Sequence, residues 1–457
     1  MKTVNVKKKP ARLISAYISS QYLNALNVFL SFLIIDRFAT NFITTYSLCI
    51  ALYSFISKVI YGIISSVGIW GIAELKKNNH DQYQKYLRYG LWICIITGSV
   101  LMIFFFNLRY ILIYFLSNQN LIQAMHKFYS FFIIGIIPNF IIMLLIQIYS
   151  SKNQGRMIIK IRMTKLIIMP STLLLTFLLC PNPSTNQVGL TFGIGYLATA
   201  SFFMTSLYKH ITKKTDGHKS KPTNSNNKSN FLPIFLNGLS YSLLITSELA
   251  YNFLVLFFLS TINITVEKVY YFIQQIIFFI CTLPFAVSQA IAFTSSINGI
   301  KNLKVTLKYC LKIAIRLLLV MGVISIILLV TYSLTLRYII TIHSITDPDL
   351  KNQYRISYFL IPLFLFLEIL RYFLMAILRG IKYNFLPMMT NVLAFTLISL
   401  PCGIIGSKLF NRPVISFVIG ELLSISLTTL ILYYILIRYS ILTKTSTVMS
   451  LDKDYSL

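Results

Sequence analysis

The chain has 457 residues, of which 56% are hydrophobic and only 12% are charged, and its mean hydropathy is +0.73. A soluble globular domain carries about a quarter of its residues as charges, so this composition excludes an ordinary soluble protein. The net charge of +29 does not indicate a nucleic-acid-binding protein, because the basic residues fall in short connections and tails rather than on an aromatic-interleaved basic face.

Apolar runs recur along the whole chain, with the length of about 20 residues that a helix needs to cross the hydrocarbon of a bilayer. The runs are continuous and lack the period of two that barrel strands show. Since backbone groups in lipid must be satisfied inside helices or a closed barrel, they predict an all-α polytopic membrane protein. About twelve spans are expected, near 13–35, 42–72, 89–108, 128–150, 161–180, 188–208, 232–260, 268–294, 311–334, 355–378, 386–409 and 414–438.

Lys and Arg are distributed unevenly among the connections between spans. With a cytoplasmic N-terminus, about 30 of the 41 basic residues lie in cytoplasmic segments and about 9 in outer loops. Cytoplasmic loops carry the excess of Lys and Arg in membrane proteins. Both ends are therefore expected in the cytoplasm, as a basic tail at 1–12 and a second tail at 439–457.

The longest polar segment, 209–231, is rich in Ser, Asn, Lys and Pro and is typical of a solvated cytoplasmic linker. It divides the chain into halves at 13–208 and 232–438. Each half has a basic amphipathic stretch before its third span, "DQYQKYLRYGLWI" or "LKVTLKYCLKIAI". Each also has a Gly-basic turn after its fourth span, "NQGRM" or "LRGIKYNFLP". The matched order of these motifs predicts a duplicated six-helix unit.

The sequence has no phosphate-binding glycine loop, no HExxH motif and no nucleophile elbow. Its six cysteines lack the spacing of metal ligands. These observations argue against an enzyme and against ATP-driven transport within this chain, and no cofactor is expected.

Three segments carry a resemblance to a known family: "KNNHDQYQKYLRYGLW" (77–92), "TLPFAVSQAIA" (282–292) and "ILRGIKYNFLPMMTNVLAFTLISLPCGIIG" (377–406). The chain resembles the NorM-like branch of the multidrug and toxic compound extrusion (MATE) family. This family is part of the superfamily of multidrug, oligosaccharidyl-lipid and polysaccharide exporters. The resemblance implies two pseudo-symmetric six-helix bundles around a central cavity, which alternate between outward-open and inward-open states.

The resemblance also assigns two acids within spans. Counting back from "PFAVSQ" places the seventh-helix Glu of the branch at Glu248. The tenth-helix Asp, eleven residues before the Arg of the Arg-Gly turn, corresponds to Glu368. These carboxylates would couple transport to H⁺, or hold Na⁺ between them, and the bound cation would act through its different affinity for the two states. An isolated carboxylate in hydrocarbon costs roughly 2.5–3.5 kcal/mol, so each is expected to face a cavity, a partner or an ion.

In the N-terminal half the chain departs from the family pattern. The first-helix acid of many members aligns with Ser31, and the fifth-helix Asn with Ser171. The family's "GRLG" turn is "DRFA" (36–39) here, which makes Asp36 a loop residue. An N-terminal proton site of the DinF-like kind is therefore not expected.

Arg371 stands three residues after Glu368, where the family has Gln, and at this spacing the two side chains share a helix face. Three interpretations stay open. The pair can be permanent architecture, Arg371 can switch between Glu368 and Glu248, or Arg371 can meet an anionic substrate.

Four further polar residues fall within or beside spans. Lys58 lies mid-span and either snorkels toward an interface, which we prefer, or lines a cavity and favours an anionic substrate. Gln275 is a further candidate for a cavity wall. Glu421 predicts a helix–helix hydrogen bond, and Glu267, next to Lys268 near the outer end of the eighth span, predicts a solvated ion pair.

The resemblance implies a secondary active efflux antiporter that exports small organic molecules in exchange for H⁺ or Na⁺. One alternative is a flippase for a lipid-linked saccharide or another anionic lipid, within the same superfamily. A minor alternative is a non-transporting membrane protein or a membrane-embedded transferase. The expected partners are the lipid bilayer and a small organic substrate, without nucleic acid, and a monomer in the bacterial inner membrane is expected.

Overall fold

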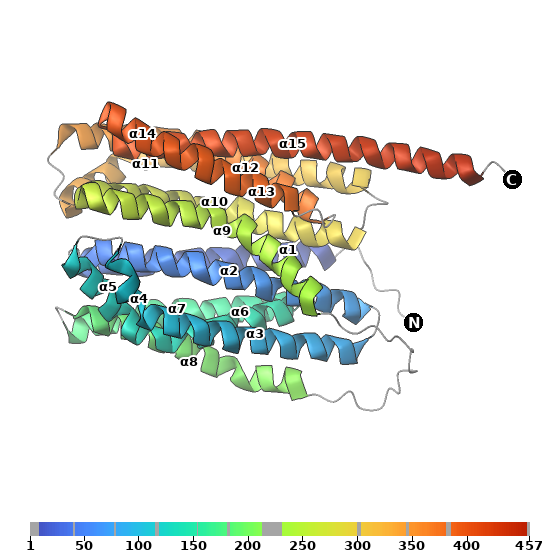
Figure 1. The fold of residues 1–457 in the computed structure, drawn as a ribbon, viewed down its shortest axis with the longest axis horizontal. Helices are drawn as coiled ribbons and strands as arrows, with labels where there is room; N and C mark the ends of the chain where they lie inside the picture. The colour runs from blue at the N-terminus through green and yellow to red at the C-terminus, as the bar shows by residue number, and fades with distance from the viewer. Residues whose placement is uncertain are drawn as a thin grey trace. The chain divides into compact units, whose positions relative to one another are not determined.

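The computed structural model describes residues 9–39, 42–76, 79–114, 118–152, 154–180, 183–212, 231–298, 303–343, 347–380 and 385–454. The regular structure of these residues is entirely helical (Figure 1). Eleven of the helices described are long and apolar enough to cross a membrane, and α9 adds a shorter apolar segment at Thr246–Ile262. The predicted all-α polytopic architecture with about twelve spans is confirmed.

The helices follow one another with short connections. In the first part of the chain they are α1 (Lys9–Phe38), α2 (Ile43–Lys76), α3 (His80–Phe106), α4 (Leu108–Leu112), α5 (Gln119–Phe132), the 3₁₀ turn η2 (Ile133–Gly135), α6 (Ile136–Ser151), α7 (Gly155–Leu179) and α8 (Thr185–Thr212). After the linker come α9 (Phe231–Ile262), α10 (Ile264–Asn298), α11 (Leu303–His343), α12 (Pro348–Gly380), α13 (Phe385–Ala394), the π-helical turn η4 (Phe395–Ser399), α14 (Leu400–Phe410) and α15 (Pro413–Asp454).

The chain divides into two compact units. Unit 1 comprises Met1–Thr282 and Arg337–Thr346, and unit 2 comprises Leu283–Leu336 and Asp347–Leu457. Helix α9 and most of α10 therefore group with the N-terminal helices, whereas the predicted division runs through the linker. The duplicated division into 13–208 and 232–438 stays a prediction, and residues 213–230 of the linker lie outside the described residues.

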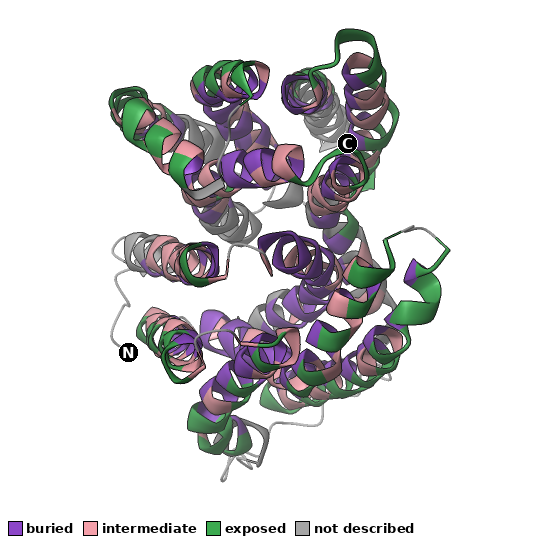
Figure 2. Cartoon of the chain, turned by 90° about the vertical axis from the view of Figure 1, so that its left-hand side faces the viewer, coloured by how far each residue is buried: buried purple, intermediate pink, exposed green. Residues whose placement is uncertain are grey.

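In unit 1, α2 packs against α3, α5, α6 and α9, because its sequence is apolar on nearly every side. Small residues allow the close approach that membrane helices need. A Cβ added at Gly62 would lie 2.6 Å from the Ser242 Cα of α9, and one at Gly189 of α8 only 2.1 Å from the Phe128 carbonyl oxygen of α5. Figure 2 shows exposed residues on the outer sides of the peripheral helices and buried residues where helices meet.

In unit 2, α15 packs along α12, α13, η4 and α14. A Cβ at Gly420 would lie 2.7 Å from the Ser399 carbonyl oxygen, so this glycine sets the distance between α15 and η4. The π-helical turn stands directly before Leu400 and Pro401. Proline has no N–H to continue the helical bonds, and a π-bulge is a usual way for a helix to absorb such a break.

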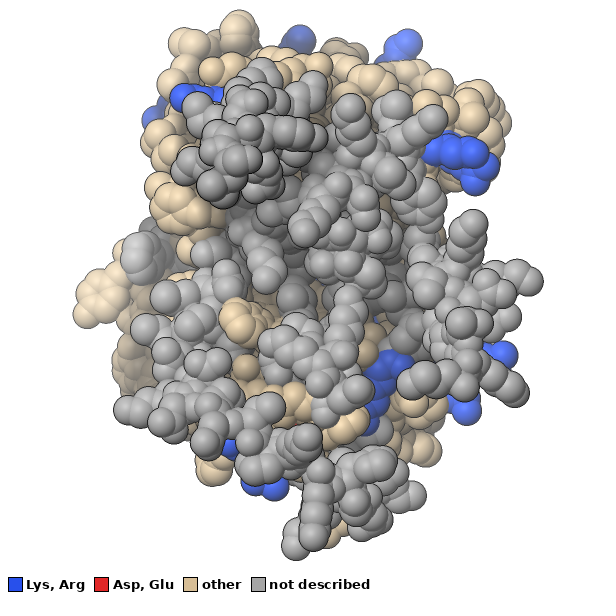
Figure 3. All heavy atoms as spheres, turned by 90° about the vertical axis from the view of Figure 1, so that its right-hand side faces the viewer, with Lys and Arg blue, Asp and Glu red and all other residues tan. Residues whose placement is uncertain are grey.

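Basic side chains are visible among the described residues on one face of the protein. In the view of Figure 3, the described charged side chains that can be seen are Lys and Arg, and no described Asp or Glu is visible. Which side of the protein is cytoplasmic stays a prediction.

Two acids of unit 1 lie differently from the prediction. Asp36 is not in a loop: α1 continues to Phe38, and the Asp36 side chain is fully buried. Glu267 is not solvated but fully buried, and it accepts a hydrogen bond from Ser47 Oγ at 2.5 Å. Both predictions were wrong because charged and polar neighbours in the sequence do not by themselves make a residue exposed to solvent. The helices extend further than the apolar runs and bury both acids.

Candidate functional site

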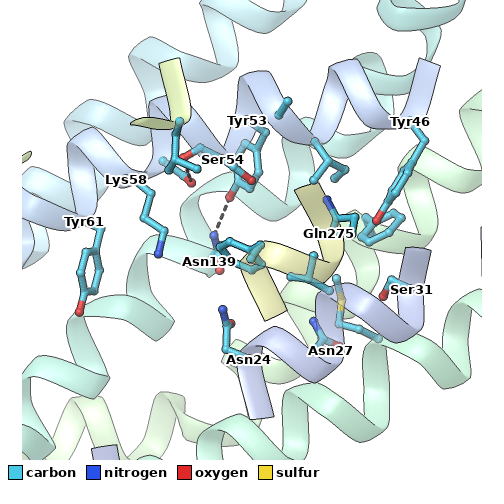
Figure 4. A pocket seen from close by; sticks show the side chains of 18 of the residues that line it. Asn24, Asn27, Ser31, Tyr46, Tyr53, Ser54, Lys58, Tyr61, Asn139 and Gln275 are labelled. Carbon is cyan, nitrogen blue, oxygen red and sulfur yellow. Dashed lines mark hydrogen bonds between the residues drawn. The ribbon is translucent and has the colours of Figure 1, made fainter. Parts of the chain in front are cut away.

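Unit 1 contains a cavity of about 170 Å³ between α1, α2, α6, α7, α8, α9 and α10. One water needs only about 10–15 Å³ on this kind of measure, so the cavity holds several waters or a polar ligand group. Figure 4 shows that the lining is rich in amides and hydroxyls, which come from several helices. Among the lining amides are Asn24, Asn27, Asn139, Gln274 and Gln275.

Three cationic side chains line this cavity. Lys58 comes from α2, and its Nζ lies 5.4 Å from the centroid of the Tyr61 ring. Arg162 comes from α7 and donates from Nη1 to Asn24 Oδ1 of α1 at 2.7 Å. Lys165, one turn further along α7, places its Nζ 4.7 Å from the centroid of the Tyr196 ring. The aromatic faces stabilise the ammonium groups without neutralising them.

The cations of α7 are deeply buried and stand close to other positive charge. Arg162 is only 8% exposed and Lys165 only 6%. Arg162 repels both Lys58 and Lys165 electrostatically. No Asp or Glu is among the described residues that line the cavity. The Nε atom of Arg162 has no hydrogen-bond partner. The cavity therefore carries concentrated positive charge together with a free guanidinium donor.

Neutral hydrogen bonds hold the walls of the cavity in place. Asn139 Nδ2 of α6 donates to Tyr53 OH of α2 at 2.6 Å (Figure 4). Nearer the other end of α6, Gln147 Nε2 donates to Tyr61 OH at 3.3 Å. These bonds fix the tyrosines beside the cations and do not use the Arg162 Nε donor.

Unit 2 contains a separate buried ion pair. Arg371 and Glu368, one turn apart on α12, are both fully buried. The guanidinium donates from Nε at 3.0 Å and from Nη2 at 2.6 Å to the carboxylate, and from Nη1 to Asn391 Oδ1 of α13 at 3.0 Å. The Phe395 ring lies 5.4 Å from the guanidinium carbon. Of the interpretations left open for Arg371, this geometry is that of the ion pair.

The family model called MatE matches residues 17–174, a range that includes Lys58, Arg162 and Lys165. Over this range the chain is similar to the MATE family. Whether it belongs to the NorM-like branch stays a prediction. No curated protein matches the sequence.

Solved structures share the MATE fold over nearly the whole chain. The eukaryotic MATE transporter AtDTX14 has 14% identity and a TM-score of 0.70, with 94% of this chain and 95% of that chain covered. A multidrug resistance MATE family transporter in an outward-facing conformation has 13% identity and a TM-score of 0.75, over 96% and 97%. A transporter of the wider superfamily from Pyrococcus furiosus has 13% identity and a TM-score of 0.70, over 94% of each chain. The protein thus has the MATE fold, and its apolar helices make it a multi-pass membrane protein.

The acids that the MATE resemblance assigns lie in different units. Glu248 is half-buried in α9 of unit 1, and Glu368 belongs to unit 2. Their joint use as a site for H⁺ or Na⁺ stays a prediction, as does a hydrogen bond for Glu421, which is buried in α15. No group of three or more His, Cys, Asp or Glu that could hold a metal ion occurs within the described part of the chain.

Of the other candidates, Lys58 and Gln275 both line the cavity of unit 1. Lys58 thus lines a cavity, as in the second of its two interpretations, and an anionic substrate for this cavity stays a prediction. Arg162 and Lys165 were not predicted as site residues, although both fall within the expected fifth span at 161–180, because they were counted with the basic residues of the preceding cytoplasmic loop. Their spacing of three, which places both side chains on one face of the helix, was the signal that could have revealed them.

Proposed function

We propose that this protein is a secondary exporter of the MATE type for small organic anions, which bind at the cationic cavity of unit 1. Transport would proceed by alternating access, in exchange for H⁺ or Na⁺. The observation that carries the proposal is the convergence of Lys58, Arg162 and Lys165 on one cavity whose described lining contains no acid.

Electrostatics favours an anionic ligand over a cationic one. A buried charge costs several kcal/mol unless it is paired, and the mutual repulsion of three cations adds to that cost. Neither Arg162 nor Lys165 forms an ion pair with any acid of the described residues. A ligand carboxylate, sulfonate or phosphate would supply the missing charge, and a guanidinium binds such groups with two parallel hydrogen bonds. A cationic substrate would meet repulsion from all three groups.

Two solved relatives support the idea that one fold carries different cavities. The outward-facing relative is described as a multidrug resistance transporter. The Pyrococcus furiosus relative is described as having a binding pocket of reverse polarity that suggests a different function. We infer that cavity charge sets substrate class among proteins of this fold, and that the basic cavity here takes anions.

The second candidate is a flippase for a lipid-linked saccharide or another anionic lipid. The same cations favour it, since a lipid phosphate presents the same oxygens as a soluble organic phosphate. For either function we propose a monomer in the bacterial inner membrane, with both termini cytoplasmic and a cation gradient as the source of energy.

Transport by purified protein in proteoliposomes tests the proposal. We expect efflux of a fluorescent organic anion under an imposed H⁺ or Na⁺ gradient, and no efflux of an organic cation of similar size. Arg162→Gln and Lys165→Gln should each reduce anion efflux at least tenfold, because a hydrogen bond to a charged group contributes about 1.5–3 kcal/mol.

Lys160→Gln is the matched control, because Lys160 is an exposed lysine on the same helix and should not matter. Efflux of the cation but not the anion would contradict the proposal. Movement of a lipid-linked saccharide phosphate between leaflets, without efflux of the soluble anion, would establish the flippase function instead.

A further inference from the structure

The wall that α1 contributes to the cavity of unit 1 carries no charge. Asn24, Asn27 and Ser31 line the cavity at spacings of three and four residues, so they share one face of the helix. Asn24 accepts the hydrogen bond from Arg162, and Ser31 stands about 10 Å further along the helix axis. In Figure 4, Lys58 lies at the Asn24 end of this row and Tyr46 at the Ser31 end.

Three buried polar atoms of the cavity wall have no hydrogen-bond partner among the described residues. They are Asn27 Oδ1 and Ser31 Oγ of α1 and Tyr271 OH of α10. The exposed fractions of these side chains are only 3%, 1% and 4%. Buried polar atoms are nearly always hydrogen-bonded, so these three call for a ligand group or for water. With Tyr46 they form what we call the neutral end of the cavity.

Aromatic contacts hold the rings of the neutral end in place. The Phe32 ring, next to Ser31 in α1, meets the Tyr271 ring edge to face, with the centroids 5.4 Å apart and the planes at 77°. The Tyr46 ring stacks on Phe192 of α8 at 5.8 Å. The hydroxyl groups of the neutral end are therefore carried by fixed rings, and a ligand meets them already positioned.

The chemistry of the unpaired atoms selects for hydroxyl groups on a ligand. An amide oxygen such as Asn27 Oδ1 only accepts hydrogen bonds, so an ionised carboxylate, which also only accepts, does not satisfy it. A ligand ammonium would donate, but the three cations of the cavity would repel it. A neutral hydroxyl both donates and accepts, and it can therefore pair with Asn27 Oδ1 and with the hydroxyls of Ser31 and Tyr271.

We propose that the anion carried by this cavity is polyhydroxylated, as a phosphorylated sugar or a sugar acid is, and that Asn27, Ser31 and Tyr271 select it by its hydroxyl groups. The cations hold the anionic group near Asn24, and the hydroxylated carbons lie along α1 toward Ser31. The inference rests on the proposed function and narrows its substrate class. A soluble sugar phosphate and the head group of a lipid-linked saccharide share this chemistry.

The test is equilibrium binding of two phosphates of the same charge and similar shape to the purified full chain. Glucose 6-phosphate carries hydroxyls on its ring, whereas the ring of cyclohexylmethyl phosphate carries none. A site built to bind a substrate hydroxyl rejects the analogue that lacks it, because its own buried polar groups are then left unpaired. We therefore expect glucose 6-phosphate to bind at least about tenfold more tightly.

Ser31→Ala, Tyr271→Phe and Asn27→Leu should each weaken the binding of glucose 6-phosphate several-fold. Each should leave the affinity for cyclohexylmethyl phosphate unchanged or make it tighter, because an unpaired polar atom has been removed. A purely structural defect would instead weaken both ligands alike. Ser201→Ala is the matched control, because Ser201 is an exposed serine of α8 outside the cavity lining and should change neither affinity.

Equal wild-type affinities for the two phosphates, both reduced by Arg162→Gln, would overturn the selection by hydroxyl groups and leave the anion site standing. If neither phosphate binds, the proposed function is contradicted and this inference falls with it. Glucose joined through phosphate to a short polyprenol, used as a competitor in mixed micelles, distinguishes the two sources. Stronger competition than by free glucose 6-phosphate identifies a lipid-linked substrate, and weaker competition identifies a soluble one.

Discussion

The guanidinium of Arg371 forms its hydrogen bonds with side chains of unit 2. Glu368 neutralises its charge and Asn391 takes a third hydrogen bond, so the group is satisfied without a substrate. Arg162 in unit 1 is the opposite case, since it is buried with an unpaired Nε and no acid occurs among the described residues of the cavity wall. This difference leads us to treat the first arginine as structural and the second as a ligand group.

Removing one member of the buried pair should destabilise the protein strongly. Glu368→Gln leaves Arg371 as an uncompensated buried charge, at an expected cost of about 3–5 kcal/mol in unfolding free energy. Replacing both partners with apolar side chains, as in Glu368→Leu with Arg371→Met, should recover most of that loss. Reversible unfolding in mixed micelles measures both changes. A Glu368→Gln variant that keeps full stability but loses ion-driven transport would show that Glu368 is a coupling acid instead.

Helix packing in unit 1 depends on glycines where two backbones meet. The Gly189 position leaves no room for a Cβ, because the Phe128 carbonyl oxygen would lie 2.1 Å away. Separating α5 from α8 would disturb the packing that supports the cavity wall at Tyr196 and Phe192 of α8. The absence of a side chain at this one position is therefore needed for the shape of the cavity wall.

Gly189→Ala should therefore lower the free energy of unfolding by about 1–3 kcal/mol, as overpacking does. Gly322→Ala is the matched control, since nothing lies within 4 Å of a Cβ at that exposed position of α11. It should stabilise the helix by up to about 1 kcal/mol, because alanine is the better helix former. Equal effects of the two substitutions would contradict the packing account.

The existence and order of the helices could be predicted from hydropathy, because each span must satisfy its own backbone in lipid. The helix ends could not. The fifth span was expected from residue 161, but α7 begins at Gly155, and Arg162 and Lys165 within it are buried. Likewise α1 extends past the apolar run to bury Asp36. Composition locates apolar segments, whereas the placement of a charge depends on partners in distant helices.

At the scale of the whole molecule, the excess of Lys and Arg predicts which connections face the cytoplasm. With a cytoplasmic N-terminus, the connection between α6 and α7 is cytoplasmic and the start of α5 is outside. Gln154 and Asn120 are exposed at these two places.

A membrane-impermeant maleimide should therefore label the Asn120→Cys variant in intact cells. It should label the Gln154→Cys variant only after the membrane is permeabilised. The accessible native thiols Cys180 and Cys402 are first replaced by serine. The reverse labelling pattern would invert the proposed orientation.

The central claim is that the basic cavity of unit 1 binds an organic anion. Its most direct test is the equilibrium binding of a labelled organic dianion to the purified protein, with an organic dication of similar size as competitor. We predict that the dication does not compete, and that Arg162→Gln with Lys165→Gln weakens dianion binding at least about 100-fold, since each contact contributes about 1.5–3 kcal/mol. Unchanged dianion affinity in the double variant, or tighter binding of the dication by the wild type, would contradict the account.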